Sequence, residues 1–298
     1  MTISHLSAYW GARAESVDQA AEKVARLLAA LADVDPVLTG WRDQALSKTK
    51  ALAEPVVTAN HDELVDRLLA GRIRRHDNGE TLDDFGYSLS WWNARDNEDA
   101  TAVLTIRTGI TSSKMLNSVT IRLPDSAAAP GIYTKVNATH LMSTLIAIFR
   151  PDRAHWLSRD LENLQKEPNR PLPDGSVAIG TIIGHAAGWA TYLRDGEGNG
   201  LNPALLPETA TIERIDDGTL VTLGDDPANP PLDDVLAVRA AMGYTVPPRD
   251  EEAAAAVDAA PAASASGAPV AEHQERPRRD IGEGAKSADE ASPRPKDQ

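Results

Sequence analysis

The chain has 298 residues, a length that suits one large domain or two small ones. Its formal net charge of −14 disfavours general nucleic-acid binding, because phosphate contacts need Lys and Arg to displace counterions. The absence of cysteine excludes disulfides, thiolate metal sites and cysteine nucleophiles.

The N-terminal third predicts two helices. Residues 16–32 carry apolar side chains at helical spacing, with Ser16 as the expected N-cap. Just before them stands YWGARAES, residues 9–16, which we interpret as a tight turn onto the core with Trp10 as a buried anchor. The second helix covers residues 61–71 and is closed by Gly71.

Three strands are predicted next, over residues 86–93, 101–109 and 117–124. Each alternates apolar with polar side chains and is bounded by polar residues, Gly or Pro. Loops of roughly ten residues join them, which indicates an antiparallel meander. A helix over residues 134–149 follows.

The C-terminal third predicts strands at 177–184 and 188–193 and a hairpin of 210–215 with 219–224. The Asp217-Gly218 pair is the turn signal of that hairpin. A last helix covers 232–243 and ends at Gly243. Helix, strands, helix, strands and helix in this order predict an α+β fold, in which helices pack on a mostly antiparallel sheet.

The composition changes near residue 246. Beyond this point Pro, Ala, Ser, Gly and charged residues dominate, so too little apolar surface is available for a core. We therefore predict an α+β domain at 1–246 and a disordered tail at 247–298. From Arg249 onward the chain has 7 Lys and Arg and 11 Asp and Glu, so most of the negative charge belongs to the predicted domain.

A search for catalytic motifs finds no nucleophile elbow, no zinc-protease helix and no phosphate-binding loop. The glycines of residues 195–200 are not followed by a helix that could hold a pyrophosphate, and we interpret them as a flexible turn. His61 begins a predicted helix and His76 lies in a polar turn, while His155 and His185 have no ligand spacing around them. We therefore predict no catalytic, cofactor or metal site.

Acidic side chains lie on both sides of the first predicted strand of the meander. Asp83 and Asp84 precede it, and three more acids follow Trp91 and Trp92, namely Asp96, Glu98 and Asp99. Adjacent residues of a strand face opposite sides, so at most one of the two tryptophans is easily buried. Because Trp is enriched at binding hot spots, Trp92 and these acids are our candidate protein-binding residues. A solvated hairpin with one packed Trp is the alternative.

Several separated stretches carry a resemblance to a known family. They are YWGARAES, then LLAGRIRRHDNGETLDDFGYSLSWWN, NSVTIRLP, GWATYL and DGTLVTLGDDP. In this order they resemble the immunity protein 52 family of bacterial polymorphic toxin systems, over roughly residues 7 to 243. The matching positions are Tyr9, Trp10, Gly11, Arg13, Glu15, Gly86, Trp92, Asn93, Gly188, Trp189 and Tyr192.

The resemblance implies a cytoplasmic, non-enzymatic α+β antidote that binds a cognate toxin, and the family is associated with nucleases of the restriction-endonuclease type. The acidic charge agrees, since a nuclease needs a basic surface to hold its substrate. The sequence also lacks a secretory signal and a long apolar segment, so we expect no membrane contact. Two other functions stay open: an adaptor or chaperone for a secreted effector, and a metal-dependent hydrolase that uses the acidic loops.

Overall fold

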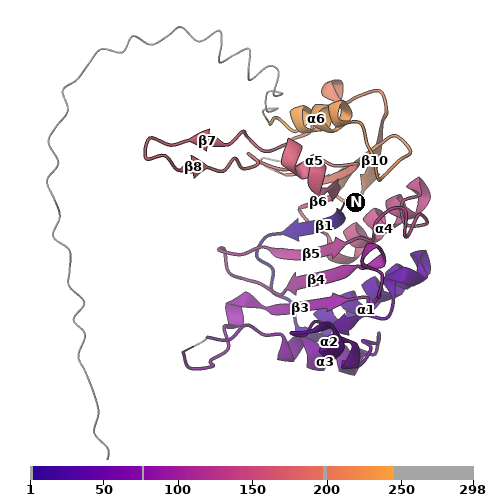
Figure 1. Cartoon of the computed structure of the whole chain (residues 1–298), viewed down its shortest axis with the longest axis vertical. Coiled ribbons are helices and arrows are strands. Elements are labelled where there is room, and N and C mark those ends of the chain that lie inside the picture. The colour runs from indigo at the N-terminus through magenta and orange to yellow at the C-terminus, as the bar shows by residue number, and fades with distance from the viewer. Residues whose placement is uncertain (1–2, 76, 197–199, 245–298) are drawn as a thin grey trace, which may run out of the picture. The chain divides into compact units, whose positions relative to one another are not determined.

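The structure is a computed structural model that describes residues 3–75, 77–196 and 200–244 (Figure 1). These residues belong to one compact unit, Met1–Pro248. The predicted tail at 247–298 lies outside the described residues, so the division into domain and tail remains a prediction.

An antiparallel sheet of nine strands, which are not arranged in chain order, forms the centre of the described part. Neighbouring strands follow the order β10-β11-β9-β6-β1-β5-β4-β3-β2, and every pair is antiparallel. The strands are β1 (Ser4–Trp10), β2 (Arg42–Asp43), β3 (Tyr87–Trp92), β4 (Val103–Thr108), β5 (Asn117–Arg122), β6 (Arg153–Ser158), β9 (Ala190–Arg194), β10 (Ala210–Ile215) and β11 (Gly218–Leu223). A separate two-stranded hairpin consists of β7 (Arg170–Pro171) and β8 (Val177–Ala178).

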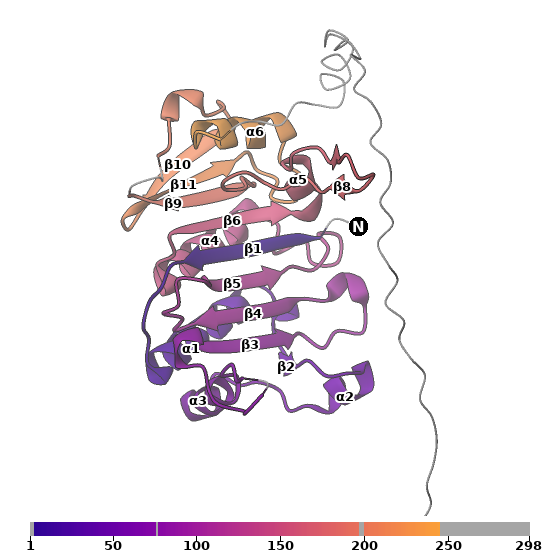
Figure 2. The same ribbon diagram turned by 90° about the vertical axis from the view of Figure 1, so that its left-hand side faces the viewer.

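Helices α1 (Val17–Val34), α3 (His61–Ala70) and α4 (Lys135–Phe149) lie on one side of the sheet. In Figure 2, α1 and α4 lie behind the strands. The other helices are α2 (Lys48–Ala53), α5 (Arg159–Leu164) and α6 (Leu232–Ala241). The predicted α+β class, with helices on a mostly antiparallel sheet, is therefore confirmed.

Local sequence signals explain where these helices begin and end. Ser16 caps α1 with a capping box, because its side chain accepts from Gln19 N while the Gln19 side chain accepts from Ser16 N. Thr134 caps α4 in the predicted place. Gly71 ends α3 without left-handed backbone; a Cβ there would lie 2.1 Å from the backbone oxygen of Ser88, so close packing requires the glycine.

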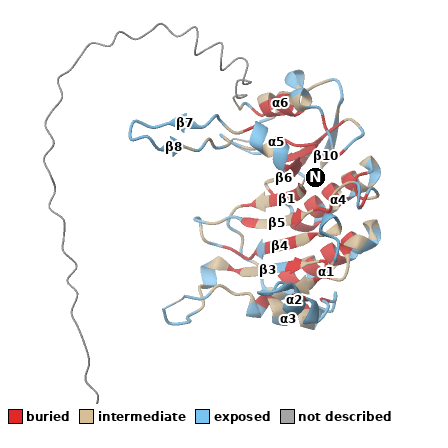
Figure 3. Ribbon diagram, in the orientation of Figure 1, coloured by how far each residue is buried: buried red, intermediate tan, exposed pale blue. Residues whose placement is uncertain are grey.

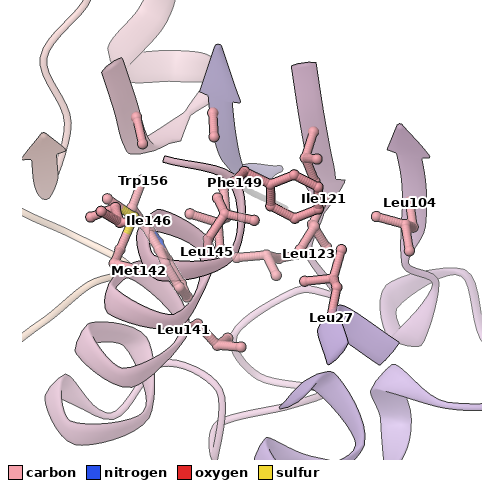
Figure 4. Packing of buried hydrophobic residues seen from close by; sticks show 14 of the residues in the cluster. Leu27, Leu104, Ile121, Leu123, Leu141, Met142, Leu145, Ile146, Phe149 and Trp156 are labelled. Atoms are coloured by element: carbon pink, nitrogen blue, oxygen red, sulfur yellow. The ribbon is translucent and has the colours of Figure 1, made fainter. Parts of the chain in front are cut away.

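The core lies between the sheet and this helical layer, as the buried residues in Figure 3 show. Side chains at i, i+3 and i+4 of α4 meet alternate side chains of the strands (Figure 4). Trp10 is 1% exposed and its ring stacks on Phe149 at a centroid distance of 5.4 Å. Trp156 contacts Trp189 edge to face at 5.8 Å. The tryptophans of this aromatic-poor chain thus form much of its core.

The interpretation of residues 9–16 as a tight turn is wrong in part. Tyr9 and Trp10 end β1, a strand between β5 and β6 in the middle of the sheet. The chain turns after them, where Gly11 N donates to Asp152 Oδ2 at 2.8 Å. Trp10 is buried as expected, but as the last core-facing residue of a strand.

The strand predicted over 177–184 is also wrong, except for Val177–Ala178. β9 already pairs with β6 on one side and β11 on the other, so neither side of β9 is free to pair with this segment. Its backbone bonds locally instead: Glu167 N donates to the oxygen of Thr181 at 3.1 Å. The segment therefore forms part of an exposed arm. The meander β3-β4-β5 and the hairpin β10-β11 are confirmed.

Among the described residues, no helix is long and apolar enough to cross a membrane.

Candidate partner-binding surface

The predicted acidic residues form two groups at opposite ends of β3. Asp83 and Asp84 precede this strand, and Asp96, Glu98 and Asp99 follow it. Six residues of strand span about 20 Å, so the five carboxylates do not converge on one point. All five residues are exposed. The structure therefore offers two acidic patches at the β3 end of the sheet.

The second acidic group lies on a loop that Asn93 holds in place. Asn93 is 2% exposed, and its Nδ2 donates to the backbone oxygens of Val37 at 2.8 Å and Ala100 at 2.9 Å. Its Oδ1 accepts from Ala102 N at 2.9 Å. A 3₁₀ turn, Glu98–Ala100, follows with Asn97 as its N-cap. Because three buried bonds fix the base of the loop, its carboxylates are held in defined positions on the surface.

Trp92 lies beside this loop in a surface hollow of about 350 Å³. The lining includes Lys48, Arg95, Asp96 and Glu98, and Lys48 Nζ lies 3.0 Å from a carboxylate oxygen of Asp96. The two tryptophans divide as predicted: Trp91 is fully buried and donates to Asp43 Oδ1 at 2.9 Å, whereas Trp92 is half-buried. A hollow lined by an indole ring and charged side chains is suited to binding a side chain of another protein rather than to catalysis.

The first acidic group has mainly local partners. Asp83 pairs with Arg72, and the backbone oxygen of Asp84 accepts from the amides of Thr111 and Ser112, both at 3.0 Å. Gly86 directly follows with φ of +61°. These contacts dock the turn before β3 onto the end of β4.

The residues expected as structural family markers are placed by packing. Trp189 and Tyr192 are fully buried in the core, beside β6 and β11. A Cβ on Gly86 would lie 2.2 Å from the backbone oxygen of Thr108. Each of these residues therefore has a structural reason for its identity.

A further surface, which the sequence analysis missed, is the side of the sheet opposite α1 and α4. We call it the open face and define it by the alternate residues of β1, β3, β4, β5 and β6 that point away from those helices. It includes Arg107, Arg122 and Arg153. The alternation of Arg107 and Arg122 with buried residues was visible in the sequence, but β1 and β6 were not predicted, so the face could not be assembled.

Histidines of the open face stay neutral at ordinary pH. The pKa of His155 is lowered to about 3, mainly by burial and also by the nearby charges of His5 and Arg153. Burial also lowers the pKa of His5, although Glu162 acts against this. Within residues 3–75, 77–196 and 200–244, no three His, Asp or Glu side chains come together as a possible metal site.

The geometry thus defines an α+β protein whose notable features are exposed charged surfaces. Comparison with known families then identifies it: residues 4–231 match the model of Immunity protein 52, and the chain belongs to this family. None of the curated proteins matches the chain. Among solved structures, the chain is similar to "Pseudomonas aeruginosa T6SS protein PA0821", with 13% identity and a TM-score of 0.48. That similarity covers 82% of this chain and 73% of the other.

Proposed function

We propose that this protein is an immunity protein that binds and neutralises a cognate bacterial toxin by direct protein contact. The observation that carries the proposal is the family match over residues 4–231, most of the part that the structure describes. Toxin binding needs a rigid, exposed surface and no chemistry of its own. The charged loop that Asn93 fixes beside Trp92 is such a surface.

The toxin in this proposal is a nuclease, neutralised in the cytoplasm of the cell that makes both proteins. A nuclease holds its substrate through a basic surface, because nucleic-acid affinity comes largely from Lys and Arg on phosphates. Exposed carboxylates such as Asp96, Glu98 and Asp99 match that surface in charge. Complementary fields also speed encounter, which matters for an antidote that must act before damage occurs.

The experiment is co-expression with the toxin encoded beside this gene. We expect the wild-type protein to restore growth and to bind the purified toxin domain. Glu98→Lys together with Asp99→Lys should weaken binding by about tenfold or more. Glu208→Lys together with Glu213→Lys is the matched control, since both are exposed acids at or near β10, the opposite edge of the sheet.

Two results would count against the proposal at different levels. A wild-type protein that neither binds the neighbouring toxin nor restores growth overturns the immunity function. A toxin domain that is neutralised but has no nuclease activity overturns only the nuclease target. The same assay on DNA and RNA substrates separates these outcomes.

A further inference from the structure

The open face has a charge opposite to that of the chain as a whole. The five strands that form it, β1, β3, β4, β5 and β6, contain no Asp or Glu. Their three arginines, Arg107, Arg122 and Arg153, all occupy open-face positions. Because the chain has a net charge of −14, five neighbouring strands without a carboxylate are a distinct feature.

These arginines lack the acidic partners that other arginines have. Arg67, Arg72, Arg194 and Arg214 each pair with a carboxylate. In contrast, Arg107, Arg122 and Arg153 form no ion pair with any described residue. Their positive charge is therefore available to a partner.

The surroundings of Arg153 and Arg122 differ. The guanidinium of Arg153 lies 5.2 Å from the centre of the Tyr9 ring, a cation–π arrangement. Arg122 Nε is buried and has no hydrogen-bond partner within the described part of the chain. No carboxylate among the described residues therefore neutralises the guanidinium of Arg122.

Strand register sets the spacing of the three cations. Arg107, Ser118, Tyr9 and Arg153 lie side by side across β4, β5, β1 and β6. Three strand spacings separate Arg107 from Arg153, or about 14 Å. Arg122 lies four residues along β5 from Ser118, or about 13 Å. The arginines thus frame a patch of the size that one protein surface covers.

Hydroxyl groups fill the area between the arginines. Ser7 Oγ donates to Thr120 Oγ1 at 3.3 Å, and the hydroxyls of Ser90 and Thr105 lie 3.4 Å apart. These short side chains leave the guanidinium groups as the longest polar groups around them. They also offer further hydrogen bonds to an approaching surface.

An exposed apolar arm stands beside the open face. It consists of residues 170–184, with β7 and β8 toward its outer end, and in Figure 1 it points away from the side that α1 and α4 occupy. Its apolar side chains are unusually exposed: 58% for Val177, 78% for Ile179 and 51% for Ile183. Figure 3 shows most of the arm as exposed, with intermediate residues toward its inner end. Clustered apolar side chains in solvent mark a contact surface for protein.

We propose that the open face and the arm together dock an acidic surface patch of a protein, and, resting on the proposed function, that this protein is the cognate toxin. The arginines would pair with its carboxylates while the arm packs on apolar residues beside them. A protein fits better than nucleic acid, because the chain repels phosphate overall and an apolar arm gains nothing from a phosphate backbone. This surface adjoins the acidic loop, because Trp92 is itself an open-face residue of β3 and lies in register with Val103 and Arg122.

Charge reversal with a matched control tests the open face. We expect Arg107→Glu and Arg153→Glu each to weaken binding of the full-length protein to the purified neighbouring toxin domain by about tenfold, measured by calorimetry. Arg26→Glu should change the affinity by less than about twofold. Arg26 is an exposed arginine that forms no ion pair with the described residues, and it lies on α1, on the other side of the sheet. Thermal melts establish that all three variants fold.

The arm is tested by one substitution, with a control residue of the same exposed fraction. Ile179→Asp should weaken the complex by about tenfold, because a charge would be buried at the contact. Val136→Asp on α4 should leave it unchanged, and Val136 has the same 78% exposure as Ile179.

The outcomes separate this inference from the proposed function. Absence of toxin binding by the wild type overturns both. Toxin binding that Arg107→Glu, Arg153→Glu and Ile179→Asp leave intact overturns the docking surface alone. Binding of DNA or RNA by the wild type that the arginine variants abolish, with toxin binding unaffected, would show that the open face serves nucleic acid instead.

Discussion

Replacing Asn93 with Ala tests how the acidic loop is held. Asn93 is 2% exposed and connects three chain segments through one side chain. Its amide nitrogen donates to Val37 O and Ala100 O, and its oxygen accepts from Ala102 N, at 2.8–2.9 Å. An alanine can make none of these bonds, and it leaves all three backbone groups without their partner.

The expected magnitude follows from the number of bonds. Each intramolecular hydrogen bond contributes about 1 kcal/mol net, and an unsatisfied buried group costs about 1–3 kcal/mol. Water that enters the space left by the amide will offset part of this cost. We therefore expect Asn93→Ala to lower the free energy of unfolding by about 3 kcal/mol. For a domain of this size, that corresponds to a melting temperature lower by about 6–12 °C.

The assay is urea and thermal unfolding followed by circular dichroism, with Asn97→Ala as the control. Asn97 lies four residues away in the same loop, but it is exposed and makes one capping bond, to Asp99 N at 3.1 Å. Its loss should cost less than about 1 kcal/mol. If both variants lose the same stability, the three bonds of Asn93 do not hold the loop and our reasoning fails.

Three more predictions concern the rest of the fold. Trp10→Ala should lower the free energy of unfolding by about 3–5 kcal/mol, measured by calorimetric melting, and the folded variant should still bind the toxin. A stable variant that no longer binds would contradict the structural role of Trp10. Gly86→Ala should destabilise more than Gly79→Ala in urea titrations, because both need positive φ but only Gly86 meets Thr108 O at 2.2 Å; equal losses would contradict this. In the folded state the pKa of His155 is lowered to about 3, so the unfolded state takes up a proton at a higher pH than the folded state does. The free energy of unfolding should therefore fall by up to about 1.4 kcal/mol per pH unit as the pH drops from 6.5 toward 3. His155→Gln should flatten this slope, and an unchanged slope would refute the assignment.

Much of the fold was predictable because its elements carry strong local signals. Ser16 caps α1 as expected, and the helix predicted over residues 134–149 is observed as Lys135–Phe149. The hairpin forms as predicted, although its turn is Asp216-Asp217, one residue before the predicted Asp217-Gly218, and the three strands of the meander alternate clearly. Each of these signals depends on neighbours within about ten residues, so no knowledge of tertiary structure was needed.

The strands that were missed lack such signals. In β1 the core-facing residues are Leu6, Ala8 and Trp10, and the small alanine weakens the alternation. β6 begins shortly after α4 and contains Arg153 and His155, so its sequence looks like a polar loop that follows a helix. Both strands are stabilised by pairing with residues more than 30 positions away, which a local pattern does not contain.

The charged surfaces of the candidate site also depend on strand pairing that a local sequence pattern does not contain. The sequence places acids on both sides of Trp91 and Trp92, which favours one acidic surface, but β3 separates them into two groups. The three open-face arginines stand alone in three separate strands, and nothing local indicates that they meet. Only the register of β4, β5, β1 and β6 brings them together.

A net charge of −14 therefore describes the chain but not its surfaces. Five neighbouring strands, β6, β1, β5, β4 and β3, have no carboxylate, so the molecule presents an acidic loop beside Trp92 and a basic open face. A partner that used both would need a basic and an acidic patch of its own, which discriminates against wrong partners better than net charge does. Combining Glu98→Lys with Arg107→Glu keeps the net charge constant while reversing both surfaces. If surface pattern rather than net charge governs binding, this double variant will bind the toxin more weakly than either single variant.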